Sequence, residues 1–320
     1  MGAFRLVPPD LRRYYRVMQC PAVGRRDREK GTIVYPAISR RSGGLSIGIN
    51  LFPAGKACSF DCPYCEVFAP ESSTAGSELS IRSLEAELSS FLDTLATQPS
   101  TGETVRDLCL SGDGEPTLSP RLGEALELLG RTRRERPGLL GQASIVLITN
   151  STGFLSPSVS SILERFSREE SLEVWAKLDA GTEGLFQIMA GLKGGERAVA
   201  GSLRGDGAAL SLERVAQGLL GYARRAPVVV QTMLCEVDGS GPSDGEIEAY
   251  AALVSRLSRE GARISELHLY TYARPSPTGR CAALSDQKLA SRASFVASAT
   301  GLRVRAFGAE AEILLEGSGP

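Results

Sequence analysis

The sequence has 320 residues, of which 42% are hydrophobic and 23% are charged, and its formal net charge at pH 7 is −1. This is the composition of a globular protein with ample material for a core, and no apolar run reaches the ~18 residues needed to cross a bilayer. The N-terminus lacks the apolar region of a signal peptide, and seven cysteines, an odd number with three clustered, do not form a disulfide framework. We therefore expect a cytoplasmic protein with reduced thiols and no membrane partner.

Basic charge is concentrated in the first 41 residues, which hold ten basic and three acidic side chains. Their net charge is thus about +7, which leaves about −8 for the rest of a chain whose total is −1. With Tyr14 and Tyr15 among them, these residues suit an RNA backbone and its bases. The alternative is a solvated extension that packs on the acidic body. We assign residues 1–44 to a basic N-terminal extension, 45–310 to a core domain and 311–320 to a C-terminal tail.

The core domain reads as strands that alternate with helices. We expect strands at 45–52, 105–110, 144–149, 172–178, 227–234 and 264–270, and helices at 81–95, 120–134, 157–166, 212–224, 244–260 and 285–299. The first strand alternates apolar with small or polar residues, whereas 145–148 and 228–230 are continuous apolar runs typical of strands covered on both faces. Six β/α units predict an α/β fold with a parallel sheet and right-handed crossovers. Six units instead of eight predict an open, partial (β/α)6 barrel.

Three cysteines follow the first strand in the loop Cys58-Ser-Phe-Asp-Cys62-Pro-Tyr-Cys65, at CxxxCxxC spacing. A structural zinc ion or a closed iron–sulfur cube takes four protein ligands, so three thiolates on a four-iron cube leave one iron open to a small molecule. Phe60 and Tyr64 supply an apolar wall, and Pro63 stiffens the loop. The alternative is a zinc site with a fourth ligand from elsewhere, although the single histidine, His268, lies far along the chain.

Further motifs end the later strands, at the edge where a parallel sheet presents its functional loops. Together with the cysteine loop they resemble the radical S-adenosylmethionine (SAM) superfamily, and within it the wyosine-synthesis-like, tRNA-modifying branch. The resemblance covers roughly residues 33–300, and the fold it implies is a partial barrel of the radical SAM type. Its motifs beside the cysteine loop are Ile33–Pro53, Ser111-Gly-Asp-Gly-Glu-Pro-Thr-Leu, Leu147-Ile-Thr-Asn, Trp175-Ala-Lys-Leu-Asp-Ala-Gly, Val230-Gln-Thr-Met and Tyr270-Thr-Tyr-Ala-Arg-Pro.

The resemblance implies that Cys58, Cys62 and Cys65 bind a [4Fe–4S] cluster, with SAM on the fourth iron. In the relatives a Gly-Gly-Glu-Pro motif holds the amino group of SAM. The matching tetrapeptide here is Asp113-Gly114-Glu115-Pro116, which follows Gly112 and departs from the pattern at Asp113. A strand-to-helix turn with an incidental acid is the alternative for this segment.

Two further strand ends complete the SAM site that the resemblance implies. Asn150 is expected to contact the carboxylate or ribose of SAM, with helix capping as the alternative. Lys177 and Asp179 lie on one face of their strand. The lysine would meet the SAM carboxylate and the aspartate the ribose or the substrate, with a plain surface ion pair as the alternative. The predicted cofactor-binding residues are therefore Gly112, Asp113, Gly114, Glu115, Asn150, Lys177 and Asp179.

Other polar residues and segments have weaker signatures. Gln231, Thr232 and Arg274 end the last two predicted strands, and Arg274 suits a carboxylate or phosphate on a substrate. His268 is either a satisfied core histidine or a residue that faces the barrel interior. Cys235 and Cys281 also follow these strands, as hydrogen-atom donors, auxiliary ligands or inert buried thiols. The glycine-rich segment Gly191–Gly207 is either a lid or an insertion without a role.

The sequence thus predicts an enzyme that binds a [4Fe–4S] cluster and SAM and generates a 5′-deoxyadenosyl radical to abstract hydrogen from an unidentified substrate. Synthesis of a tricyclic base on tRNA is the best-known task of the relatives. The expected partners are SAM, an electron donor such as flavodoxin or ferredoxin, and RNA through residues 1–41. One alternative is a non-catalytic iron–sulfur protein for electron transfer or regulation. Another is an RNA-binding module that uses the basic extension.

Overall fold

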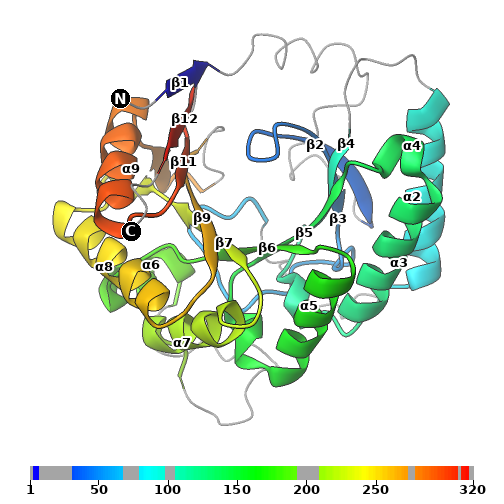
Figure 1. Ribbon diagram of the computed structural model, residues 1–320, viewed down its shortest axis with the longest axis horizontal. Coiled ribbons are helices and arrows are strands. Elements are labelled where there is room, and N and C mark those ends of the chain that lie inside the picture. The colour runs from blue at the N-terminus through cyan, green and yellow to red at the C-terminus, as the bar shows by residue number, and fades with distance from the viewer. Residues whose placement is uncertain are drawn as a thin grey trace.

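The computed structural model describes residues 3–6, 31–67, 79–97, 105–192, 209–272, 278–308 and 311–316. Among these residues, one curled sheet has the strand order β1-β12-β11-β9-β7-β6-β5-β4-β3-β2. Helices cover its convex side, as Figure 1 shows. The strands of this sheet are β1 (Ala3–Leu6), β2 (Val34–Ser39), β3 (Gly44–Ile49), β4 (Val105–Leu110), β5 (Ser144–Thr149), β6 (Glu173–Lys177), β7 (Val228–Met233), β9 (Ile264–Tyr270), β11 (Val304–Phe307) and β12 (Ala311–Leu315).

The predicted partial barrel is confirmed, because the six predicted strands are β3, β4, β5, β6, β7 and β9, paired in parallel in that order. The sheet is also wider than predicted. β11 adds a parallel strand beside β9, β2 pairs antiparallel with β3, and β12 and β1 continue the sheet antiparallel beyond β11. The sheet therefore includes backbone from within residues 1–44 and 311–320.

The helices match the predicted ones closely, and two short helices were missed. They are α2 (Ile81–Thr97), α3 (Leu122–Glu135), α4 (Pro137–Leu140), α5 (Pro157–Glu169), α6 (Glu183–Ala190), α7 (Leu212–Ala223), α8 (Asp244–Arg259) and α9 (Asp286–Thr300). The predicted capping box at the start of α8 is present, with Ser243 and Glu246 each bonding the other's backbone. The two missed helices are α4 and α6, and α6 begins at the cap Thr182 and ends at Gly191, whose φ of 67° suits glycine. No helix of the described chain has the length and apolarity to cross a membrane.

Side chains alternate along each strand between the face covered by the helices and the concave face. On β9, Leu267 and Leu269 are fully buried in the core under the helices. His268 therefore faces the concave side, where its ring packs edge-on against Trp175 and Phe307. The concave side thus carries polar as well as apolar side chains, and a ligand would find hydrogen-bonding groups there.

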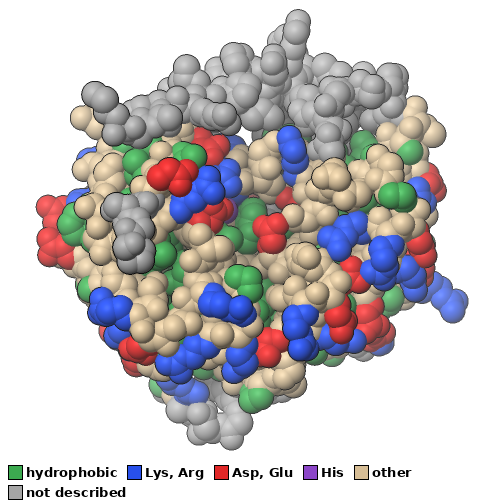
Figure 2. All heavy atoms as spheres, in the orientation of Figure 1, with side chains coloured by type: hydrophobic (Ala, Val, Ile, Leu, Met, Phe, Trp, Pro, Cys, Tyr) green, Lys and Arg blue, Asp and Glu red, His purple; other side chains and the backbone are tan. Residues whose placement is uncertain are grey.

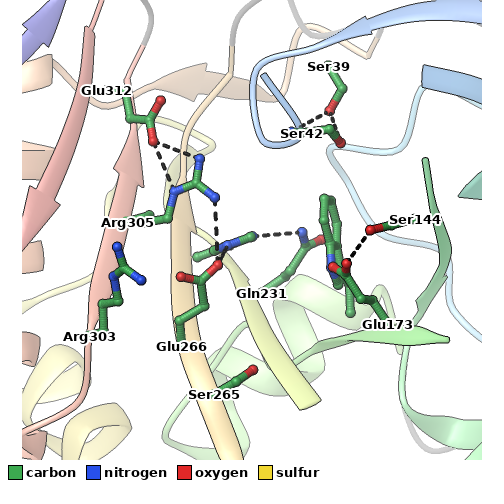
Figure 3. A network of polar contacts seen from close by, with 12 residues as sticks. Ser39, Ser42, Ser144, Glu173, Gln231, Ser265, Glu266, Arg303, Arg305 and Glu312 are labelled. Carbon is green, nitrogen blue, oxygen red and sulfur yellow. Dashed lines mark hydrogen bonds and ion pairs between the residues drawn. The ribbon is translucent and has the colours of Figure 1, made fainter. Parts of the chain in front are cut away.

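A chain of polar contacts crosses this concave side (Figure 3). Arg41 donates to Gln231 Oε1 at 2.8 Å, and Gln231 Nε2 lies 3.3 Å from His268 Nδ1. His268 Nε2 lies 2.5 Å from Glu266 Oε1, which Arg305 approaches at 3.6 Å. Burial lowers the pKa of His268, so the ring is neutral and donates through Nε2. His268 is thus a satisfied interior histidine.

Candidate functional site

The cysteine loop lies at the carboxyl edge of the sheet, directly after β3. It is held by backbone contacts to two other strand–helix connections. Asp61 donates to the carbonyl of Ala190 at the end of α6, at 2.8 Å. Ala57 pairs with the segment after β4: its carbonyl accepts from Glu115 N at 2.7 Å, and its N–H donates to Asp113 O at 3.2 Å. The thiols are therefore fixed relative to the Asp113–Glu115 segment.

The three loop cysteines are free thiols of intermediate exposure. Phe60 between them is 8% exposed and packs edge-on against Phe186, with ring centroids 5.8 Å apart. Burial, then the negative charge of Glu115, raises the pKa of Cys58 to about 12. Burial, then Cys58, likewise raises the pKa of Cys62. These two thiols thus lie in a dry environment that favours their neutral form.

The donor set fits an iron–sulfur cluster in kind and number. Soft thiolates are the ligands of such clusters, and a cationic metal centre would supply the positive charge that ionised Cys58 and Cys62 lack. In the described chain, no three Cys, His, Asp or Glu side chains already surround a common metal position. Cluster binding by the three thiols stays a prediction.

Glu115 is the most enclosed carboxylate of this edge, at 2% exposure. Its Oε1 accepts from Thr117 N at 3.1 Å, Thr117 Oγ1 at 2.7 Å and Thr149 Oγ1 at 2.7 Å, and its Oε2 accepts from Asn150 N at 2.6 Å. Burial raises the pKa of Glu115, while these hydrogen bonds oppose the shift. The side chain is thus a rigid acceptor that joins the end of β4 to the end of β5.

Asn150 connects Glu115 to the cysteine loop. Its Nδ2 donates to Ser59 Oγ at 2.7 Å and lies 3.6 Å from Cys58 Sγ, while its Oδ1 accepts from Thr152 N at 3.0 Å. The next residue, Ser151, is left-handed at φ 71°. Asn150 therefore stabilises the turn that leads into Thr152–Leu155 and also contacts the cysteine loop, while its contact with SAM stays a prediction.

Lys177 and Asp179 form a second polar group beside the loop. Lys177 Nζ lies 3.1 Å from Asp179 Oδ2 and 2.5 Å from the hydroxyl of Tyr270. Tyr64 from the cysteine loop donates to Asp179, which also accepts from Met233 N at 2.8 Å. Burial would lower the pKa of Lys177, but Asp179, Tyr270 and Cys62 together more than offset this and the pKa is raised. This is a buried pair and not a surface ion pair, because the two side chains are only 13% and 10% exposed.

The structure does not gather every predicted polar residue at this edge. Gln231 belongs to the polar chain of Figure 3, and Thr232 turns to the other face, where it donates to the carbonyl of Leu178 at 2.9 Å. Arg274 and nearly all of Gly191–Gly207 lie outside the described residues. Asp113, the departure from the Gly-Gly-Glu-Pro pattern, accepts from Asn50 Nδ2 at 2.8 Å and so helps to fix the loop after β3.

Three residues that were not predicted also contribute to this site: Asn50, Ser59 and Tyr270. Asn50 accepts from Phe52 N at 3.0 Å and Asp113 N at 3.1 Å, and thereby turns the chain from β3 into the cysteine loop. Its position resembles that of Asn150, since each follows the last residue of a strand. That pattern was visible in the sequence, whereas the partner of Tyr270 lies 93 residues away along the chain.

The fold is similar to that of a radical SAM enzyme. The chain is similar to the crystal structure of a radical SAM methyltransferase from Sphaerobacter thermophilus, with a TM-score of 0.53 and 13% identity over 94% of this chain and 82% of that one. No family model matches the sequence.

Sequence relatives carry the designation UPF0026. A UPF0026 protein from Synechocystis sp. is 27% identical over 252 residues, which cover 77% of this chain and 78% of the relative. UPF0026 proteins from two strains of Helicobacter pylori are each 30% identical, over 132 and 141 residues. These two matches span only about two fifths of the relatives' own length, at 38% and 41%.

Proposed function

We propose that the protein is a radical SAM enzyme, with a [4Fe–4S] cluster held by Cys58, Cys62 and Cys65. When bound, the cluster and SAM would supply one-electron cleavage of SAM to methionine and a 5′-deoxyadenosyl radical. The single observation that carries the proposal is the backbone pairing of Ala57 with the Asp113–Glu115 segment. It brings three thiols and a buried carboxylate from distant parts of the sequence to the carboxyl edge of a partial barrel.

The protein's own residues have distinct parts in this proposal. Glu115 is a preorganised acceptor suited to the amino group of SAM, because its four protein hydrogen bonds fix the carboxylate. Asn150 orients Ser59 and Cys58. Lys177 would bind a carboxylate, since Asp179, Tyr270 and Cys62 together keep it protonated. Phe60 and Phe186 exclude water from the side of the loop that faces α6.

Anaerobic reconstitution with iron and sulfide, followed by SAM and dithionite, tests this function. We expect 5′-deoxyadenosine by mass spectrometry from the wild-type protein and none from the variant Cys58→Ala/Cys62→Ala/Cys65→Ala. The matched control is Cys109→Ala, a buried cysteine on β4 outside the loop. A stable cluster that neither binds nor cleaves SAM would refute the proposal and favour a non-catalytic iron–sulfur protein.

We further propose RNA as the substrate class, with a flavodoxin or ferredoxin as the electron donor in a reducing cytoplasm. The support is the basic charge of residues 1–41. On the face drawn in Figure 2, by contrast, Lys and Arg side chains are interspersed with Asp and Glu. Deletion of residues 1–41 is a poor test, because it removes β1 and β2 from the sheet.

Charge neutralisation is the better test of RNA binding. The variant changes five arginines together to Gln: Arg12, Arg13, Arg16, Arg25 and Arg26. Its affinity for tRNA is measured from about 50 to about 200 mM salt, because nucleic-acid-binding proteins typically lose about 10³–10⁵-fold in affinity over this range. We expect weaker binding and a shallower salt dependence for the variant. Unchanged affinity would rule out the extension as the RNA-binding surface.

A further inference from the structure

Two cysteines outside the predicted cluster loop lie together on a small ribbon at the same edge of the barrel. The ribbon pairs β8 (Cys235–Val237) antiparallel with β10 (Cys281–Ala283), apart from the main sheet. Cys281 lies opposite Val237, and Cys235 lies opposite Ala283, so the cysteines are diagonal neighbours on one face. Both are buried, at 3% and 7% exposure, and each thiol influences the pKa of the other.

We propose that Cys235 and Cys281 form a reversible dithiol–disulfide site whose oxidation state alters the seating of the cysteine loop. A low-molecular-weight disulfide such as oxidised glutathione is the oxidant. One thiolate attacks it, forms a mixed disulfide and releases one glutathione. The other thiolate then displaces the second glutathione, so that the pair loses two electrons and two protons and the oxidant becomes two thiols.

The register of β8 against β10 determines how a disulfide between Cys235 and Cys281 would change the ribbon. Diagonal neighbours in an antiparallel pair have Cα atoms ~7–8 Å apart, whereas a disulfide prefers about 5.5–6 Å. The bond therefore pulls the two strands together by roughly 1–2 Å, and the resulting strain makes it easy to reduce again. A reversible bond is thus expected here, in contrast to a permanent structural one.

The ribbon contacts the cysteine loop directly, and this contact transmits the shift. Thr278, three residues before Cys281, donates from Oγ1 to the carbonyl of Pro63 at 3.1 Å. Pro63 lies between Cys62 and Cys65. The ribbon cysteines also share an apolar cluster with Met189 and Met233, on which Tyr64 of the same loop packs. A movement of β10 therefore acts on the middle of the predicted cluster-binding loop.

Access to the pair comes from local opening of the ribbon. Only three residue pairs join its strands, and the turn before β10, Thr278–Arg280, is exposed. Such a short pair of strands opens more readily than the main sheet. Burial raises the pKa of both thiols. Oxidation is therefore slow at neutral pH and becomes faster as the pH rises, because the thiolate is the reacting form.

Trypsin separates the relevant cysteines, so the bond can be identified directly. Cys235 lies in peptide 226–256, Cys281 in 281–288, the three loop cysteines in 57–82 and Cys109 in 107–121. The full-length protein, without reconstitution, is incubated with oxidised glutathione at alkaline pH, alkylated and digested. We expect a crosslink between 226–256 and 281–288 that dithiothreitol removes. If both peptides are instead recovered completely as free thiols, with no crosslink between them, the proposal is overturned.

A second readout tests the coupling to the loop. Alkylation rates of the thiols in peptide 57–82 are compared between the untreated and oxidised protein, and again in the variant Cys235→Ala/Cys281→Ala treated identically. We expect oxidation to change the alkylation rates in the wild type by about threefold or more beyond any change in the variant. The reason is that a shift of the loop changes how well its thiols are protected from the reagent. Equal changes in both proteins would refute the coupling. Cys235→Ala and Cys281→Ala alone serve as folding controls, and neither experiment depends on the proposed SAM chemistry.

Discussion

A single methyl group at position 114 tests whether the pairing of Ala57 with the Asp113–Glu115 segment holds the cysteine loop in place. A Cβ on Gly114 would lie 2.3 Å from the carbonyl oxygen of Ala57 and 2.4 Å from Cδ2 of Phe52. Both are below any normal contact, so the loop has to withdraw by roughly 1 Å before an alanine fits. The clash is with backbone, which cannot rotate away as a side chain does.

The expected cost follows from the contacts that the withdrawal breaks. Two backbone hydrogen bonds join Ala57 to Asp113 and Glu115. Each contributes about 1 kcal/mol, and overpacking adds about 1–3 kcal/mol, so Gly114→Ala should lower the free energy of unfolding by about 3–5 kcal/mol. The displaced loop should also lose most of its capacity to bind iron on reconstitution.

Urea unfolding measures the first effect, with Trp175 as the reporter, because it is the only tryptophan and is 5% exposed. Iron and sulfide content after reconstitution measures the second. The matched control is Gly123→Ala in the first turn of α3, where a Cβ would meet nothing within 4 Å. That change should be neutral or stabilising by up to ~1 kcal/mol. If Gly114→Ala unfolds at the same urea concentration as the wild type and binds the same amount of iron, the pairing does not hold the loop.

Three further predictions concern Glu115, His268 and Ser243. Glu115→Gln places an amide N–H donor opposite buried N–H and O–H donors, so the free energy of unfolding measured in urea should fall by about 1–3 kcal/mol. Unchanged stability would contradict this. Burial holds the pKa of His268 below its ordinary 6.5, so on acidification the unfolded chain takes up the proton before the folded chain does. The contribution of neutral His268 to the free energy of unfolding is therefore complete above pH 6.5 and falls as the pH drops toward the folded pKa. Urea midpoints from pH 7.5 to 5.5, a range about one unit either side of the ordinary value, should show that decline, and His268→Asn should flatten it. Ser243→Ala removes the cap of α8 and should cost about 1 kcal/mol without any effect on iron content; a loss of iron would mean that α8 supports the site.

Most of the parallel sheet could be predicted because each strand is a short apolar run with its own local signature, as in Val228–Met233. The edge strands could not. β2 contains Pro36, which argues against a central strand but is tolerated in an edge strand such as β2. α6 has only eight residues, too few for a clear helical period. Periodicity also cannot assign a partner to an isolated short strand such as β11.

The candidate site shows the same division between local and long-range information. The spacing of the cysteines and the Glu115 motif is local, and the structure places both at one edge of the sheet. The contact of Asp113 with Asn50 joins residues 63 apart in sequence, and that of Tyr64 with Asp179 joins residues 115 apart. Neither residue pair has a sequence signature, because each depends on how two strands are aligned in the sheet.

The β2–β3 turn also constrains the order in which this protein is completed during synthesis. Arg40 in that turn donates to the carbonyl of Gly308, 268 residues further along the chain, and β1 pairs with β12 near the opposite end of the described sequence. At ~5–20 residues per second, the ribosome needs roughly 15–50 s to add the missing partner. Until then β1 lacks its partner strand β12, so its backbone hydrogen-bonding groups are exposed to other nascent chains. Slower translation of the last third of the message should therefore increase aggregation of this protein.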